Sequence, residues 1–139
     1  MSGKTIVLDA NILIRAVLGT RVREYIFNNA GAVNFFAPDV AYNDARKYLP
    51  GLLTKRGIDA GVAMLLLDRL ENVVKIIEVE VYREMQKQAL QRIAIRDEDD
   101  WPVLACAMVL NCPVWTEDTD FFGTGVATWN TDRISLYFS

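Results

Sequence analysis

The sequence has 139 residues, 52% of them hydrophobic and 24% charged, a globular composition that excludes a disordered chain. Its net charge of −3 argues against a protein that holds nucleic acid through bulk positive charge. It has no histidine, which excludes Ser-His-Asp and Cys-His catalysis and zinc motifs built on histidine. An enzyme with this sequence must therefore use carboxylates, Lys, Tyr, Cys or a metal-bound water.

Short apolar runs alternate along the chain with segments of helical periodicity. The predicted elements, in chain order, are a strand at 5–8, helices at 11–18 and 21–28, a strand at 33–37, helices at 38–53 and 59–70, a strand at 73–79, helices at 81–93 and 101–110, and strands at 113–116 and 126–129. Pro50 is expected to kink or split the helix that contains it. The alternation predicts an α/β fold, a three-layer sandwich with a central, mostly parallel sheet of about five strands in a single domain over residues 1–139.

The N-terminal segment lacks the long apolar core of a signal peptide, and no apolar stretch reaches the length of a membrane span. We therefore expect a cytoplasmic protein without membrane contact. The apolar helix at 59–70 contains Met64–Leu67, flanked by Val62 and Leu70. Those side chains could form a buried stripe or a dimer face, and the sequence leaves both open.

Acidic residues are concentrated in one window of the sequence. Residues 97–120 hold seven Asp and Glu and no Lys or Arg, so the rest of the chain carries a net charge of +4. Ligands of parallel α/β sheets bind at the carboxyl ends of the strands. Asp9 follows the first predicted strand and Asp118 follows the strand at 113–116, so both are expected at that edge.

Such a group of acids needs a compensating charge. Two carboxylates about 5 Å apart repel each other by roughly 3 kcal/mol at an effective dielectric constant near 20. Mg²⁺ and Mn²⁺ prefer oxygen ligands, and a site without histidine suits them better than zinc or copper. A bound cation of this kind lowers the pKa of a water and orients a phosphate for attack. The sequence therefore favours a Mg²⁺ or Mn²⁺ site.

Four segments carry a further pattern, LDANIL, NDARKYL, DDWPVLACA and VWTEDTDF, at residues 8–13, 43–49, 99–107 and 114–121. In this order, over nearly the whole chain, they resemble the four motifs of the PIN domain, the ribonuclease fold of VapC-type toxins. The resemblance implies a catalytic group of Asp9, Asp44, Asp100 and Asp118. The family usually has Glu where this chain has Asp44, so the implied metal ligands are Asp9, Asp100 and Asp118.

The resemblance also implies an activity and partners. The activity is hydrolysis of RNA phosphodiester bonds by a Mg²⁺- or Mn²⁺-dependent endoribonuclease, as in the toxin of a toxin–antitoxin pair. The toxin branch further implies a homodimer and an antitoxin protein. Four residues are candidates for supporting the acids, Asn11, Thr116, Asp120 and Asp97. Two others, Arg15 and Arg46, are candidates for phosphate contacts because they lie near the acids in sequence.

Each of these residues also has a structural explanation. Asp9 could cap the following helix, and Asp99 or Asp100 could cap the helix that begins beside Pro102. Asn11 could orient Asp9 or cap a helix, Asp120 could be a turn residue, and Asp97 could belong to a solvated loop. For Trp101, Trp115 and Trp129, packing is favoured over base stacking.

Two other functions remain open. A non-catalytic PIN-like domain that binds RNA or a protein is compatible with the replacement of the usual Glu by Asp44. A phosphohydrolase of the haloacid dehalogenase type also places an Asp after its first strand and forms a phosphoaspartate. That family requires a second Asp two residues later, where this chain has Asn11.

Overall fold

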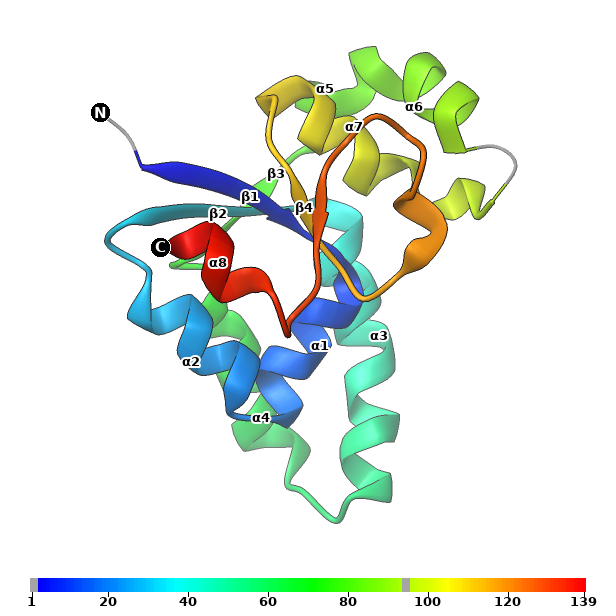
Figure 1. The fold of residues 1–139 in the computed structure, drawn as a ribbon. Helices are drawn as coiled ribbons and strands as arrows, with labels where there is room; N and C mark the ends of the chain where they lie inside the picture. Colours follow the sequence, from blue (N-terminus) through cyan, green and yellow to red (C-terminus); the bar gives the residue numbers. More distant parts are fainter. Residues whose placement is uncertain (1–2, 94–95) are drawn as a thin grey trace.

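The computed structural model describes residues 3–93 and 96–139. It contains one sheet of five parallel strands in the order β3-β2-β1-β4-β5, which confirms the predicted fold class (Figure 1). The strands are β1 (Lys4–Leu8), β2 (Val33–Pro38), β3 (Val74–Ile77), β4 (Val114–Trp115) and β5 (Thr128–Trp129). The helices are α1 (Ala10–Leu18), α2 (Arg21–Asn28), α3 (Asp39–Lys55), α4 (Ala60–Leu70), α5 (Val79–Tyr82), α6 (Gln86–Ile93), α7 (Trp101–Leu110) and α8 (Ile134–Phe138).

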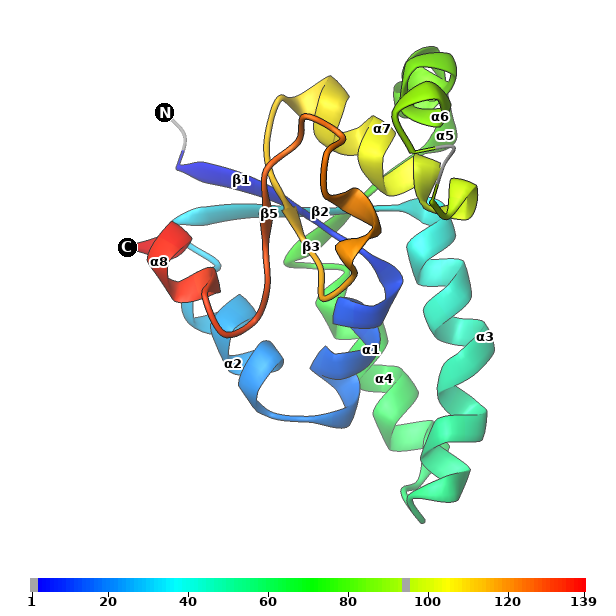
Figure 2. The ribbon, with the colours of Figure 1, turned by 45° about the vertical axis from the view of Figure 1, so that its right-hand side comes forward.

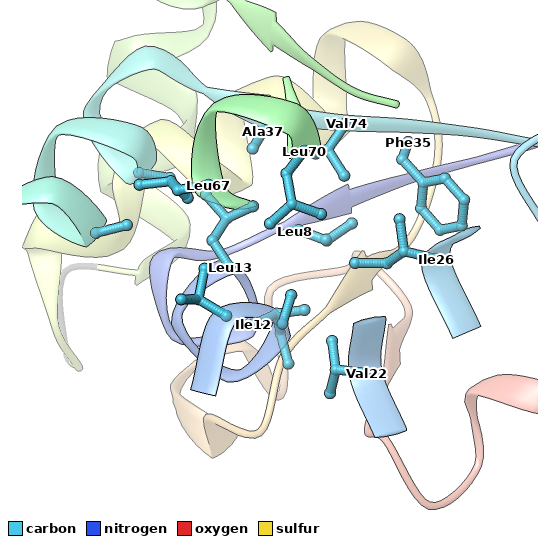
Figure 3. Packing of buried hydrophobic residues seen from close by; sticks show 14 of the residues in the cluster. Leu8, Ile12, Leu13, Val22, Ile26, Phe35, Ala37, Leu67, Leu70 and Val74 are labelled. Carbon is cyan, nitrogen blue, oxygen red and sulfur yellow. The ribbon is translucent and has the colours of Figure 1, made fainter. Parts of the chain in front are cut away.

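Helices cover both faces of the sheet and give two hydrophobic cores. Helices α1–α4 and α8 lie on one face, and α5–α7 lie on the other (Figures 1 and 2). Side chains of a strand alternate between faces, so Leu8 packs in the first core while Val7 packs in the second. Figure 3 shows the first core, where Leu8, Ile12 and Leu70 come together from β1, α1 and α4. Burial on both faces explains why the strand sequences are continuously apolar.

Most predicted elements are present, with three differences. Pro50 does not split α3, which continues to Lys55. Proline has no N–H to donate to the carbonyl one turn earlier in the helix, and because Pro50 is exposed, water can solvate that carbonyl. The helix expected at 81–93 is divided into α5, a 3-10 turn η1 (Arg83–Met85) and α6. The helix starts early because Asp39 accepts hydrogen bonds from Val79 N and from the Tyr82 hydroxyl, at 3.3 and 2.6 Å. Helix α8 was not predicted.

The apolar helix α4 has both of the surfaces that the sequence left open. Ala63, Leu67 and Leu70 are buried against the core. On the outer side, Val62 and Leu65 are 68% and 61% exposed and line an apolar groove of about 360 Å³. Among the described residues, none of the helices has the length and apolar character needed to cross a membrane.

Candidate functional site

Asp9 occupies the carboxyl end of β1 and the N-cap of α1. One carboxylate oxygen, Oδ1, accepts a hydrogen bond from Ile12 N at 3.0 Å, as a helix cap does. The other oxygen, Oδ2, accepts a hydrogen bond from the Thr116 hydroxyl. The side chain is buried, and this burial raises the pKa of Asp9 to about 6 against the lowering effect of both hydrogen bonds. Asp9 therefore caps the helix and also takes part in a contact with the segment after β4.

Strand register brings these two segments together. Leu8 pairs with Trp115 in the parallel ladder, so the residues that follow, Asp9 and Thr116, lie side by side at the same edge. The Thr116 hydroxyl oxygen also accepts from Asp118 N at 2.9 Å, and Asp118 Oδ1 accepts from Asp120 N at 2.8 Å. This chain of hydrogen bonds fixes the loop after β4 and places Asp118 near Asp9, where its charge contributes to raising the pKa of Asp9.

Asp100 joins the same group from the start of α7. It occupies the N-cap position, but its side chain makes no capping hydrogen bond. Its Oδ2 atom is buried and has no hydrogen-bond partner among the described residues. Burial, followed by the charges of Asp118, Asp97 and Asp9, raises the pKa of Asp100 to about 7. The side chain therefore points toward other carboxylates rather than capping its helix.

Asp97 and Asp120 border this group. One carboxylate oxygen from each of Asp97, Asp100 and Asp120 lies within 4.8 Å of the others. Asp97 caps the 3-10 turn η2 (Glu98–Asp100) by accepting from Asp99 N at 3.0 Å, and it is exposed, as the loop explanation expects. Partial burial and the neighbouring Asp118 raise the pKa of Asp120. The five acids from three loops thus form one negatively charged edge of the sheet.

Asp44 and Asn11 lie outside these contacts. Both are exposed, Asp44 on α3 and Asn11 on α1. Across residues 3–93 and 96–139, no hydrogen bond or ion pair links either side chain to Asp9, Asp100 or Asp118. Their expected roles therefore stay predictions, and the helix-capping alternative for Asn11 is likewise not seen in the described contacts.

The two arginines with expected phosphate contacts differ in their surroundings. Arg46 is engaged by two carboxylates, Asp68 and Glu71, each at 3.3 Å. Arg15 instead lines a pocket of about 440 Å³ together with Arg21 and Arg56. Arg21 is paired with Asp132 at 2.9 Å, whereas no ion pair among the described residues involves Arg15. Arg46 would have to exchange its present partners to bind a phosphate.

The sequence did not single out Glu117, which the structure places beside the acids. Its Oε2 atom accepts from Thr131 N at 2.7 Å and from the Thr131 hydroxyl at 2.6 Å. That hydroxyl in turn accepts from Trp115 Nε1 at 3.1 Å. Glu117 lies within the acidic window, but its partner is 14 residues further on in a segment without a motif, so the sequence alone gave no signal for this contact.

We expect the substitution Thr116→Val to lower the free energy of unfolding by about 1–3 kcal/mol, because a buried carboxylate and the Asp118 N–H both lose a partner. The pKa of Asp9 should rise further without the hydroxyl donor. Urea unfolding followed by circular dichroism measures the loss. Thr116→Ser is the matched control, since it keeps the hydroxyl and should stay close to wild type; a loss in Thr116→Val no larger than that in Thr116→Ser would show that the hydroxyl contacts do not stabilise the fold.

The donor set fits a hard divalent cation. Every side chain in the group offers oxygen, and Asp100 presents a buried oxygen without a hydrogen-bond donor in the described chain. Burial and neighbouring carboxylates raise the pKa values of Asp9 and Asp100, so the protein compensates their negative charges only in part. Mg²⁺ and Mn²⁺ would supply that compensation and prefer such ligands.

Comparison with known structures finds the same fold in several proteins. The chain superimposes on PAE2754 from Pyrobaculum aerophilum with a TM-score of 0.72 and 14% identity, covering 97% of this chain and 89% of the other. For FitAcB from Neisseria gonorrhoeae the TM-score is 0.65 with 21% identity, and for a toxin–antitoxin complex from Klebsiella pneumoniae it is 0.62 with 18% identity. Each of these two matches covers 91% of this chain and 97% of the other chain.

No match was found among curated proteins. A family model described as PIN domain matches residues 7–139, a span that includes all four acidic motifs, the end of β1 and strands β2 to β5. The family resemblance expected from those motifs is thereby confirmed. The chain belongs to the PIN domain family.

Proposed function

We propose that this protein is a Mg²⁺- or Mn²⁺-dependent endoribonuclease and the toxin of a toxin–antitoxin pair. The observation that carries the proposal is the group of acids at the carboxyl edge of the sheet, where Asp100 lies within 4.8 Å of Asp97 and Asp120 and its buried Oδ2 lacks a donor among the described residues, with Asp9 and Asp118 close enough for their charges to raise its pKa. A site of uncompensated carboxylates is costly unless it serves to bind a cation. Membership of a family of nucleases supports the same reading.

Asp9, Asp100 and Asp118 are the residues that would hold the ion, with Asp97 and Asp120 beside them. When bound, the cation supplies positive charge at the phosphate and makes a nearby water more acidic. The Thr116 hydroxyl and Ile12 N–H hold both oxygens of Asp9, so its orientation is fixed before substrate arrives.

Substrate positioning and proton transfer would use further side chains. Water attacks the phosphorus in line with the leaving 3′ oxygen, which gives a 5′-phosphate and a 3′-hydroxyl. A site carboxylate accepts the proton from that water, and the leaving 3′ oxygen takes a proton from solvent. Asp44 is proposed to reach the site through a water rather than directly. Arg15, in the pocket with Arg21 and Arg56, is proposed to contact a phosphate of the RNA.

Protein partners are proposed from the solved structures. Structures with this fold include a toxin–antitoxin complex from Klebsiella pneumoniae and DNA-bound VapBC from Salmonella typhimurium. An antitoxin and a second copy of this chain would each need an apolar contact surface, and the exposed Val62 and Leu65 of α4 provide one. The proposed RNA substrate also implies a location in the cytoplasm.

A non-catalytic binding domain is the second candidate, favoured by one observation. The described contacts do not connect Asp44, the replacement for the usual Glu, to the other acids, so the fourth acid could be too short to complete a catalytic site. Such a domain would still bind a divalent cation and RNA, but it would not cut. A phosphoaspartate mechanism has less support, because Asn11 is exposed and Asp9 is held by two hydrogen bonds.

The two candidates differ in a cleavage assay. Purified protein is incubated with end-labelled single-stranded RNAs in Mn²⁺, in Mg²⁺ and in excess chelator, while calorimetry follows Mn²⁺ binding. Cleavage that depends on the metal, with 5′-phosphate ends, is the expected result. Mn²⁺ binding without cleavage of any RNA would replace the nuclease by the binding domain.

A further inference from the structure

A cavity of about 290 Å³ opens directly beside the acids, between the loop after β4 and the end of β5. Asp118, Thr116 and Glu117 form one side of it, so the cavity and the acid group share residues. The other side contains Phe122, Trp129 and Arg133. We propose that this cavity binds one unpaired nucleobase of the RNA next to the cleaved phosphate, an inference that rests on the proposed nuclease function.

Two aromatic side chains give the cavity stacking surfaces. Phe122 is 57% exposed, so its ring is accessible to a ligand. Trp129 is half-buried, and its ring packs against that of Tyr137, with ring centres 5.6 Å apart and planes at 35°. Aromatic rings in this setting bind bases of single-stranded RNA through their flat faces. Trp129, expected from the sequence to pack, therefore both packs against Tyr137 and lines the cavity.

Polar groups at the rim suit the edge of a base. The Asn130 side-chain oxygen accepts from Arg133 N at 3.0 Å. In the described part of the chain, no hydrogen bond or ion pair uses the Asn130 amide NH₂ or the Arg133 guanidinium, so both donors remain for a ligand. Nucleobases present carbonyl and ring-nitrogen acceptors along their edges. The donors thus match the acceptors of a base that stacks inside.

The segment that carries these donors is hydrogen-bonded to the loop that holds Asp118. Thr131 donates through its backbone and its hydroxyl to Glu117, and Trp115 Nε1 donates to the same hydroxyl. Thr131 follows Asn130 directly, so the rim is held in place relative to Asp118. A base bound here would therefore fix the register of the RNA against the acids, and a cavity of this size admits one base rather than a base pair.

Binding can be measured without cleavage. Fluorescence anisotropy in excess chelator measures the affinity of wild type, Phe122→Ala and Asn130→Ala for labelled RNAs of ten nucleotides. One set of RNAs has a single kind of base throughout, and a second set lacks the base at one position. We expect both variants to bind the intact RNAs about tenfold more weakly than wild type does. Wild type should bind more weakly when the base at one position is missing, and both variants should lose this difference between abasic and intact RNA. Phe27→Ala is the control, because Phe27 is a 39% exposed phenylalanine on α2 outside the cavity. Thermal melting confirms that the variants are folded.

Cleavage kinetics separate this inference from the proposed function. In Mn²⁺, Phe122→Ala should raise KM about tenfold with little change in kcat. Normal cleavage and unchanged RNA binding in Phe122→Ala would overturn the base pocket while leaving the nuclease intact. RNA binding that depends on Phe122, in a protein that cuts no RNA, would support the pocket and overturn the nuclease. Wild type that binds none of the RNAs would overturn the pocket and favour a protein side chain as its occupant.

Discussion

Replacing Asp9 by asparagine should lower the rate of Mn²⁺-dependent RNA cleavage by about a thousandfold while leaving the fold intact. The amide is isosteric and keeps the Oδ1 atom that accepts from Ile12 N. In wild type the Thr116 O–H group donates to Asp9 Oδ2; in the variant the new NH₂ group can donate to the Thr116 hydroxyl oxygen instead. What the substitution removes is the negative charge at the end of β1, and that charge is what a cation would bind.

The control for this variant is the same substitution at another helix cap. Asp59 caps α4 through a hydrogen bond from Gly61 N at 2.8 Å and is exposed, so Asp59→Asn preserves its cap in the same way as Asp9→Asn preserves that of α1. Asp59→Asn should cleave RNA at the wild-type rate. Rates are measured on one end-labelled RNA at saturating Mn²⁺, and undiminished cleavage by Asp9→Asn would show that the acid group is not the catalytic centre.

The sequence predicted the fold well because local and global signals agree in this chain. Alternating apolar strands and amphipathic helices leave few topologies open, and the bounds of α2 and α7 were predicted to the residue. The errors arise where a distant residue decides local structure. Asp39 starts α5 early by bonding Val79 and Tyr82, which are 40 and 43 residues away, and no local pattern reports such a contact.

The same division holds for the candidate site. Asp9 and Asp118 could be predicted from their places after strands, because parallel strands end at one edge. The hydrogen bond between Thr116 and Asp9 spans 107 residues, and it depends on the pairing of Leu8 with Trp115. The unpartnered oxygen of Asp100 depends on the packing around it, so the sequence could suggest this acid but not choose between ligation and capping.

Without a divalent cation, the protein should lose stability as pH rises from about 4 to about 7. Asp9 and Asp100 have pKa values raised from 3.8 to about 6 and about 7, so in this range the folded state holds more protons than the unfolded state. Their contribution is most favourable below pH 4 and is lost as pH passes through the folded pKa values. For the buried Asp9, the raised pKa corresponds to a loss of about 3 kcal/mol in the free energy of unfolding once pH exceeds the folded pKa. Asp100 is partly solvated, so its loss is smaller than its raised pKa suggests.

Asp100→Asn should remove part of the stability loss at high pH and part of the stabilisation by a bound metal. At pH 8 in chelator, we expect the variant to be about 2 kcal/mol more stable than wild type, or about 7 °C in melting temperature, with a shallower pH dependence. Saturating Mn²⁺ should reverse the order, because it stabilises wild type through the acids and the variant has lost one. Asp99→Asn is the matched control, since it makes the same change in charge at an exposed neighbour.

Thermal melts of the three proteins from pH 5 to pH 8, with and without Mn²⁺, test these expectations together. If repulsion among the acids is the cause, Asp99→Asn should follow wild type in both conditions, because Asp99 is exposed and makes no side-chain contact with Asp9 or Asp118 in the described part of the chain. Equal stabilisation in Asp99→Asn and Asp100→Asn would instead point to the net charge of the acidic window. A wild type whose melting temperature does not respond to Mn²⁺ at pH 8 would mean that the converging acids do not form a cation site.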